Sequence, residues 1–481
     1  MFLLLSSVAY FFSINEADND LWGHVLFGQQ ILARGMVGKV DTYSYTVAGQ
    51  PWMNHEWLSQ AILGAVFEWA GSPGLLVLKF VVATLTFLLL FSMIRRRSGA
   101  PFIWGGVGLL AIAVLARGFA IRPQVFTYCG AALTLWLIDR YRCGHERALV
   151  FFPLLSVVWA NMHGGFILGL GILGFFACAE LLRSDARVWQ PWLALIASVA
   201  VTACNPYGPR LLLYVWNELS RAHPITEWQR AAATDVAQFV FFAMFAALAL
   251  TLPLHRNWRE TGWEAVLAVG VGVLALRQQR HTPVFALCAA APLAAQLEST
   301  KDWVAVRSTF ALSRAAQRTI GVAVTALALL QLSLTGARLW RDHLQVVFDP
   351  RDYPVAAVRA LRDAASLNLA VPLDWGEYVL WFLAPQIKVS LDGRFATVFP
   401  EQVVADNVDF FASAPTWRRL LEQYPTEAVL LPANWSSPIR HEPGWQRAYG
   451  DAVAEIYVRS ERVEALRTRA QPAVAEVGVF P

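Results

Sequence analysis

The sequence predicts a mainly α-helical, polytopic transmembrane bundle followed by an extracytoplasmic α/β domain, and three observations lead to this fold class. First, 56% of the 481 residues are hydrophobic and only 15% are charged, with a mean hydropathy of +0.43. Soluble domains have roughly 45–50% apolar and roughly 25% charged residues. Second, the apolar residues gather in segments that approach the length of a membrane span. Third, strand-like and helix-like segments alternate in the C-terminal part.

About eleven apolar segments come near the roughly 20 residues that a membrane-spanning helix needs, although several are short. In chain order, the predicted spans are Met1–Ile14, Pro73–Ile94, Pro101–Ala116, Gln124–Ile138, Ala148–Ala160, Phe166–Leu182, Pro191–Cys204, Ala237–Leu254, Trp263–Leu276, Pro283–Leu297 and Thr319–Ala337. We therefore expect an integral membrane protein that is surrounded by membrane lipids.

Basic residues divide the connecting turns into two sets. Lys and Arg recur on alternate turns, at Arg95–Arg97, Arg140–Arg147, Arg183–Arg187, Arg256–Arg259 and Lys301–Arg318. The turn Asn161–Gly165 belongs to the other set and has neither residue type. Because Lys and Arg accumulate in cytoplasmic turns, the pattern predicts a cytoplasmic N-terminus and an extracytoplasmic C-terminal domain.

The charge distribution also argues against one class of partner. The formal net charge is +4, and Arg95–Arg97 is the only run of basic residues. This run directly follows an apolar segment, which is typical of a cytoplasmic anchor. A nucleic-acid-binding protein would carry a basic stripe, so no nucleic-acid partner is expected.

Two regions do not have the composition of membrane spans. Residues 15–72 are a long first outer loop, which we assign to a transmembrane module of residues 1–337. Residues 338–462 are expected to form the soluble α/β domain. Its expected strands are Asn368–Leu373, Ile387–Leu391 and Ala428–Leu431, its helices are Pro354–Ala365, Gly376–Leu383 and Thr416–Tyr424, and Trp445–Tyr449 and Ala452–Arg459 could pair as an edge hairpin. Residues 463–481 are rich in Ala, Arg and Pro and are expected to be disordered.

Acidic residues directly follow the first predicted span. Asp18 and Asp20 flank Asn19, and His24 lies four residues after Asp20. If a helix starts at Asp20 or Leu21, Asp20 and His24 share one of its faces. The alternative interpretation is that Asn19 or Asp20 only caps this helix.

A second polar group closes the first outer loop. His55 and Glu56 open the helix that leads to the second span, between Trp52 and Trp57. A glutamate in the first turn is favoured by the helix dipole. The pair is equally suited to contact a substrate.

Further polar residues fall on the predicted outer side of the bundle. They include Arg117, Arg122, His163, Arg280 and His281. Outer-side basic residues oppose the usual charge bias, so a negative partner is implied, either a phosphate or the acids of the first loop. Taken singly, each Arg fits an ordinary interfacial anchor better. Taken together, several Arg and His opposite two Asp favour a functional cleft.

Two segments of the α/β domain place acids and glycines after strands. These are Asp374–Tyr378 and Leu391–Arg394. Such residues line the crevice at the carboxyl ends of parallel strands. Asp-Gly is also a common turn sequence, so turn formation is the alternative.

These motifs resemble the GT-C superfamily of membrane glycosyltransferases, which use polyprenyl-phosphate-linked sugars. Members carry an acidic motif after the first span, where this chain has Asp18-Asn19-Asp20, and then a juxtamembrane helix, here Leu21–Arg34. In protein mannosyltransferase-like members a His-Pro-Pro segment opens the second span, and Asn54-His55-Glu56-Trp57 stands there instead. Asp374–Tyr378 is similar to a motif of oligosaccharyltransferases. The amino-acid sequence of the first loop also resembles that of bacterial GT-C-like membrane proteins, which implies a bacterial inner (plasma) membrane location.

The resemblance implies an extracytoplasmic-facing glycosyltransferase that moves a sugar from a polyprenyl-phosphate-linked donor to a lipid, glycan or protein acceptor. Asp18 or Asp20 would be the base, or would hold a divalent cation together with His24. Arg117, Arg122, Arg280 and His281 would bind the donor phosphate. His24, His55 and Glu56 would contact the sugar or the acceptor, and His163 is a further candidate for substrate binding.

Two other functions stay open from the sequence. A polymerase or ligase of lipid-linked glycans also uses outer-side Arg and His, but it relies on a large middle loop, whereas residues 205–234 are of modest length. A non-catalytic GT-C-like transporter or assembly protein is the second. Transporters usually show internal repeats, and we find none in this sequence.

Overall fold

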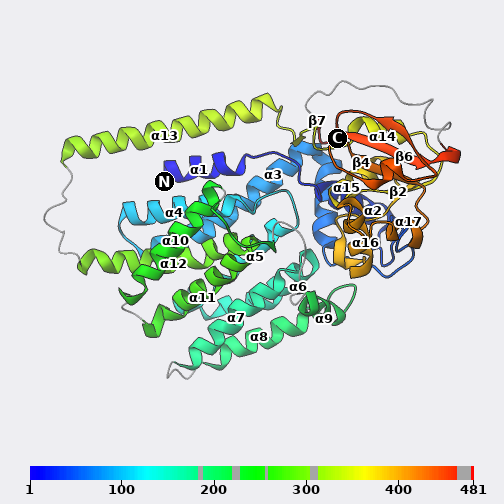
Figure 1. Cartoon of the computed structure of the whole chain (residues 1–481). Helices are drawn as coiled ribbons and strands as arrows, with labels where there is room; N and C mark the ends of the chain where they lie inside the picture. Colours follow the sequence, from blue (N-terminus) through cyan, green and yellow to red (C-terminus); the bar gives the residue numbers. More distant parts are fainter. Residues whose placement is uncertain (183–187, 219–227, 234, 255–257, 304–312, 463–477) are drawn as a thin grey trace. The chain divides into compact units, whose positions relative to one another are not determined.

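The computed structural model describes residues 1–182, 188–218, 228–233, 235–254, 258–303, 313–462 and 478–481 (Figure 1). The chain forms two compact units that do not follow sequence order. Met1–Ile14 and Leu75–Leu344 make up the first, which we call the helical unit. Asn15–Gly74 and Gln345–Pro481 make up the second, which we call the α/β unit.

The helical unit consists of helices, most of which are apolar. Its helices are α1 (Phe2–Phe12), the second part of α3 (Trp57–Arg97), α4 (Pro101–Ala116), α5 (Gln124–Arg142), α6 (Phe151–Met162), α7 (Phe166–Leu181), α8 (Trp189–Val201), α9 (Arg210–Glu218), α10 (Val236–Thr251), α11 (Trp258–Arg277), α12 (Thr282–Trp303) and α13 (Arg314–Arg341). Each apolar segment predicted from the sequence overlaps one of these helices, and α4 has the predicted bounds. Helices α7 and α8 run side by side, as do α11 and α12 (Figure 1).

Several of these helices carry large apolar side chains on their outer faces. Phe102, Leu154, Phe239 and Leu250 are all more than 60% exposed, as expected for side chains that contact lipid. Among the described residues, α3 and α13 are long and apolar enough to cross a bilayer by themselves, and α1, α4, α7, α8 and α10 are shorter apolar helices. The number of membrane crossings stays a prediction.

Contacts between side chains link the turns into two groups, one at each end of the helices. At one end, Arg96 and Arg97 of α3 pair with Asp139 of α5, and Arg142 of α5 pairs with Glu180 of α7. These residues belong to turns that the charge pattern assigns to the cytoplasm. At the other end, Arg117 donates to Gln279 and Thr127 contacts His163. The predicted alternation of turns is therefore consistent with the ends that meet in the structure.

Helix α3 is two helices joined at a kink. Gly71 has a φ of 60° and a ψ of −157°, a conformation that a residue with a Cβ rarely adopts. Pro73 follows and lacks a backbone N–H. The amphipathic segment before the kink belongs to the α/β unit, and the apolar segment that follows belongs to the helical unit.

The α/β unit is built on a five-stranded sheet in the order β3-β2-β4-β6-β5. Its strands are β2 (Leu367–Ala370), β3 (Ile387–Val389), β4 (Ala428–Pro432), β5 (Trp445–Gly450) and β6 (Ala454–Arg459). Strand β2 runs parallel to β3 and β4, whereas β6 is antiparallel to β4 and β5. The associated helices are α14 (Val355–Leu361), α15 (Leu373–Leu383), α16 (Glu401–Phe411) and α17 (Arg419–Gln423). The predicted α/β alternation and the edge hairpin are confirmed.

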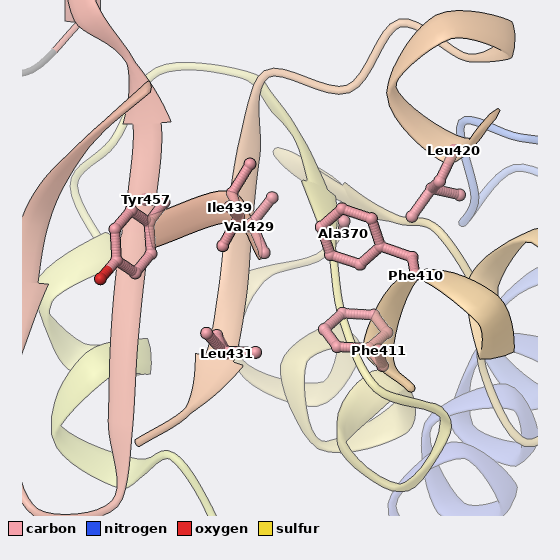
Figure 2. Packing of buried hydrophobic residues seen from close by; sticks show 8 residues of the cluster. All are labelled: Ala370, Phe410, Phe411, Leu420, Val429, Leu431, Ile439 and Tyr457. Carbon is pink, nitrogen blue, oxygen red and sulfur yellow. The ribbon is translucent and has the colours of Figure 1, made fainter. Parts of the chain in front are cut away.

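Apolar side chains of the sheet and of two helices form the core of this unit (Figure 2). Val429 and Leu431 of β4 and Tyr457 of β6 pack with Phe410 of α16 and Leu420 of α17. All five residues of β4 are buried, as expected for a central strand that is covered on both faces.

The first outer loop is part of the α/β unit, although the sequence assigns it to the transmembrane module. Ser44 forms a parallel bridge with Val389 of β3, and the Tyr45 N–H donates to the Val389 carbonyl at 3.1 Å. Near the start of the loop, Glu16 bridges to Val347. Pairing with the sheet satisfies these backbone groups and buries the loop's aromatic side chains. The boundary between the units therefore differs from the predicted division at residue 337.

Residues 478–481 also belong to the folded α/β unit, whereas residues 463–481 are expected from composition to be disordered. Strand β7 (Gly478–Val479) pairs antiparallel with β1 (Val347–Phe348). Phe480 is 1% exposed, and its ring centroid lies 4.6 Å from that of Trp22 and 5.3 Å from that of Trp381. Burial of one aromatic side chain keeps this segment in place. Residues 463–477 lie outside the described residues.

Candidate functional site

The acidic segment after the first span leads into helix α2 (Leu21–Arg34). Asp20 occupies the N-cap position, yet its side chain makes no capping hydrogen bond. The Asn19 side chain accepts a hydrogen bond from the Tyr353 hydroxyl at 2.7 Å. The Asp20 N–H donates to Asp18 Oδ1 at 3.0 Å. Helix capping therefore does not explain why position 20 carries a carboxylate. Asp18 stabilises the turn on which this carboxylate lies.

The Asp20 carboxylate faces a buried acid on helix α15, Glu377. A Cβ placed on Gly393 would lie 2.6 Å from Asp20 Oδ1 and 2.7 Å from Glu377 Oε1. Asp20 Oδ1 and Glu377 Oε1 are therefore separated by no more than the sum of these two distances. Glu377 Oε2 also accepts the Gly23 N–H at 3.0 Å. The two carboxyl groups thus converge at the start of α2, as no spacing in the sequence could show.

The surroundings of Glu377 favour its neutral form. The residue is 3% exposed. Burial, followed by the negative charges of Asp20 and Asp392, raises the pKa of Glu377 well above its ordinary value. Burial also raises the pKa of Asp374, which lies one turn earlier on α15. The sequence places Glu377 in a segment after a strand but does not single it out.

A buried ion-pair cluster lies next to this pair. Arg394 Nη2 contacts Asp41 Oδ1 at 2.6 Å and Asp392 Oδ2 at 2.7 Å, and Arg394 Nε donates to Asp392 Oδ1 at 2.8 Å. The rings of Tyr43 and Trp52 each lie 4.9 Å from the guanidinium carbon. Asp41 comes from the first loop and Asp392 follows β3, so this Arg joins the two parts of the unit. Nη1 has no hydrogen-bond partner among the described residues.

A small polar pocket opens between these elements. It has an empty volume of about 300 Å³. Its lining residues are His24, Phe27, Trp52, Met53, Asn54, His55, Glu56, Gln60, Glu377, Gly393, Arg394 and Thr397. The structure therefore brings together three residues predicted as substrate contacts, His24, His55 and Glu56.

Hydrogen bonds hold the pocket side chains in place. Asn54 donates to Gln60 Oε1 at 2.6 Å, and Gln60 Nε2 lies 3.5 Å from His24 Nδ1. Glu56 lies between the two imidazoles, 4.0 Å from His24 Nδ1 and 3.9 Å from His55 Nε2. Amide, imidazole and carboxyl groups in one pocket can donate to and accept from a polyhydroxylated ligand.

The predicted cation ligands are Asp18, Asp20 and His24. The residues that the structure describes contain no group of three or more His, Cys, Asp and Glu suited to a metal ion. Asp18, Asp20 and His24 thus do not group together as three metal ligands in this structure. The divalent cation stays a prediction.

The remaining predicted residues belong to the helical unit. Arg117 pairs with Asp235 and donates to Gln279 Oε1 at 2.8 Å, so its negative partner is a neighbouring carboxylate. The Arg280 guanidinium lies 4.3 Å from the Trp228 ring. Burial and the charge of Arg280 lower the pKa of His281 to about 4, so this imidazole is neutral at physiological pH.

His163 and Arg122 lie at turns of the helical unit. The Gly165 N–H donates to His163 Nδ1 at 2.9 Å, and the Thr127 hydroxyl contacts the same nitrogen at 2.8 Å. His163 thus organises the turn between α6 and α7 through Nδ1. Arg122 precedes α5, and its N–H donates to the Ala120 carbonyl at 2.9 Å. Asp18 and Asp20 belong to the α/β unit, and Arg122 and Arg280 belong to the helical unit.

The structure is similar to solved glycosyltransferases. An oligosaccharyltransferase from Archaeoglobus fulgidus matches over 90% of this chain and 69% of its own, with 11% identity and a TM-score of 0.60. ArnT from Cupriavidus metallidurans matches over 98% of both chains, with 13% identity and a TM-score of 0.56. The arabinofuranosyltransferase AftD from mycobacteria matches over 95% of this chain and 41% of its own, with 16% identity and a TM-score of 0.51. No protein-family model and no curated protein sequence matches the chain.

Proposed function

Because the chain has the fold of the GT-C membrane glycosyltransferases, we propose that it is an integral membrane glycosyltransferase that faces the extracytoplasmic side. It transfers a sugar from a polyprenyl-phosphate-linked donor to an acceptor hydroxyl or amine. ArnT, whose fold this chain shares, has also been solved with bound undecaprenyl phosphate. The observation that carries the proposal is the Asp20 carboxylate, which faces Glu377 across Gly393 beside a polar pocket.

In the proposed reaction, Asp20 is the general base. It takes the proton of the acceptor O–H or N–H while the acceptor atom bonds to the anomeric carbon. The bond from that carbon to the phosphate oxygen breaks, and the lipid phosphate leaves with the electron pair. Asp18 holds the turn through its hydrogen bond with the Asp20 N–H. His24, His55 and Glu56 contact the sugar or the acceptor.

For the lipid phosphate we propose Arg122 and Arg280 of the helical unit. Guanidinium groups bind phosphate oxygens in a bidentate manner, and Arg117 is already paired with Asp235. Arg122→Ala and Arg280→Ala are each expected to weaken the binding of undecaprenyl phosphate about tenfold, since a hydrogen bond to a charged group contributes roughly 1.5–3 kcal/mol. Native mass spectrometry of the protein in nanodiscs measures this binding. If both variants bind like the parent, the phosphate site lies elsewhere.

The main test compares Asp20→Asn with Asp18→Asn. Asp20→Asn keeps the shape of the side chain but removes the base, so sugar transfer from a panel of undecaprenyl-phosphate-linked sugars should fall by about 10² or more. Thermal stability and expression should stay close to the parent, because the Asp20 side chain makes no capping hydrogen bond. Asp18→Asn keeps an acceptor for the Asp20 N–H and should transfer more than Asp20→Asn. Normal transfer by Asp20→Asn would contradict the mechanism, and a parent without any transfer would favour a non-catalytic role.

A further inference from the structure

Glu377 occupies a tightly enclosed position in the pocket wall. Its carboxyl group lies between two glycines from distant parts of the chain. A Cβ on Gly23 would lie 2.2 Å from Glu377 Cδ, and one on Gly393 would lie 2.7 Å from Glu377 Oε1. These separations are far shorter than any van der Waals contact, so both positions leave room for this carboxyl group only as glycines. The segments Asp20–His24 and Asp392–Arg394 thus both pack against the side chain of Glu377 on α15.

Among the described residues, Arg394 is the cation whose charge acts on Glu377. Asp20 lies near it at the N-cap of α2, and the charges of Asp392 and Arg394 act on it from the segment after β3. Arg394 is already bound to Asp41 and Asp392 in an aromatic enclosure. Glu56 completes the charged groups of the pocket wall. The imidazoles of His24 and His55 also line the pocket. Because its one guanidinium is already paired with two carboxylates, the pocket suits an uncharged polar group better than a phosphate.

A second observation indicates that a ligand enters here. Arg394 is 6% exposed and lines the pocket, and its Nη1 has no hydrogen-bond partner among the described residues. A buried N–H donor is normally satisfied. A hydroxyl oxygen in the pocket could accept from this nitrogen, as well as from the amide groups of Asn54 or Gln60.

We propose that Glu377 is a further catalytic residue, which contacts a hydroxyl of the transferred sugar ring in this pocket and holds the ring against Asp20. The inference rests on the proposed glycosyl transfer and deepens it by assigning the sugar to the α/β unit. The amide, imidazole and carboxyl groups of the pocket wall match the hydroxyl groups of a sugar ring. The neutral form of the carboxyl, favoured by burial, can both donate and accept a hydrogen bond.

The test uses the full chain in nanodiscs and two probes, an undecaprenyl-phosphate-linked sugar that the parent binds and undecaprenyl phosphate itself. Glu377→Ala should bind the sugar-bearing lipid at least tenfold more weakly than the parent, and it should bind the bare lipid phosphate unchanged. Glu377→Gln keeps the length and the hydrogen-bonding capacity, so its affinity for the sugar-bearing lipid should stay within about threefold of the parent. Transfer rates should follow the same order.

The outcomes separate this inference from the proposed function. If Glu377→Ala binds both probes like the parent, or loses both equally, Glu377 does not contact the sugar and the inference is wrong. If the parent binds the sugar-bearing lipid in a Glu377-dependent way but transfers nothing, the contact stands and the proposed catalysis fails. Thermal unfolding of Glu377→Gln, which fills the same space between Gly23 and Gly393, controls for loss of fold. A Gln variant that is stable but loses the sugar-bearing lipid overturns the hydrogen-bonding role of Glu377.

Discussion

The two compact units place their buried charges differently. In the helical unit, Asp139 and Glu264 both contact Arg97, and Arg96 adds a second cation to Asp139. In the α/β unit, Arg394 is shared by Asp41 and Asp392, and the Glu377 carboxyl lies beside them. Buried charges are costly unless they are paired. The helical unit therefore uses its pairs to join helix ends, whereas the α/β unit retains carboxyl groups that can meet a ligand.

The largest expected effect comes from breaking the ion-pair cluster of the α/β unit. Arg394→Met would leave Asp41 and Asp392 buried without their cation, which should destabilise this unit by about 3–5 kcal/mol. Hydrogen exchange of the β3 amides, followed by mass spectrometry, measures the local loss. Arg394→Lys keeps the charge without the planar fork and should lie between the parent and Arg394→Met. Unchanged exchange in Arg394→Met would show that the cluster does not hold the first loop to the sheet.

A smaller effect is expected at the segment that closes the α/β unit. Phe480→Ala removes a fully buried ring from its contacts with Trp22, Trp381 and Phe67. The loss should be about 3 kcal/mol, at the lower end of the range for Phe→Ala in a core. In Phe480→Ala, hydrogen exchange of the backbone amides should become faster at β1 and at the start of α2 but not in α4. Val479→Ala is the matched control, because Val479 is 47% exposed.

These comparisons also show which parts of the molecule the sequence could predict. Apolar runs such as Pro101–Ala116 became helices because a continuous apolar segment has few other ways to satisfy its backbone. The strands around Ala428–Leu431 were predictable for a related reason, since a short apolar run between turns is typical of a central strand. Local composition therefore determined these elements.

The parts that were not predicted depend on contacts between distant segments. Ser44 pairs with Val389, and Gly23 donates to Glu377, across more than 300 residues of chain. Nothing in the local pattern at Glu377 distinguishes it from a helix surface acid. Phe480 follows a stretch whose composition indicates disorder, and only its partner ring at Trp22 explains why it is buried. The glycines at 23 and 393 were a usable signal, because each lies next to an acidic or basic residue in a segment that was already a site candidate.

The smallest effect is expected at the exposed ion pair of the helical unit. The side chains of Arg117 and Asp235 are 32% and 42% exposed, so solvent screens their attraction, and such pairs contribute roughly 0.2–1 kcal/mol. Arg117→Ala should therefore change stability by less than about 1 kcal/mol. Asp235→Ala should cost about 1 kcal/mol more, because the same carboxylate caps α10 by accepting the Gln238 N–H at 2.9 Å.

A double-mutant cycle with thermal unfolding separates the pair from the cap, since only the pair energy appears as coupling. Arg117→Ala should also bind undecaprenyl phosphate like the parent, because its guanidinium is already paired. An Arg117→Ala variant that is stable but no longer binds the lipid phosphate would assign Arg117 to the phosphate site. A paired charge of the helical unit would then bind a ligand, and the contrast between the two units would fail at this position.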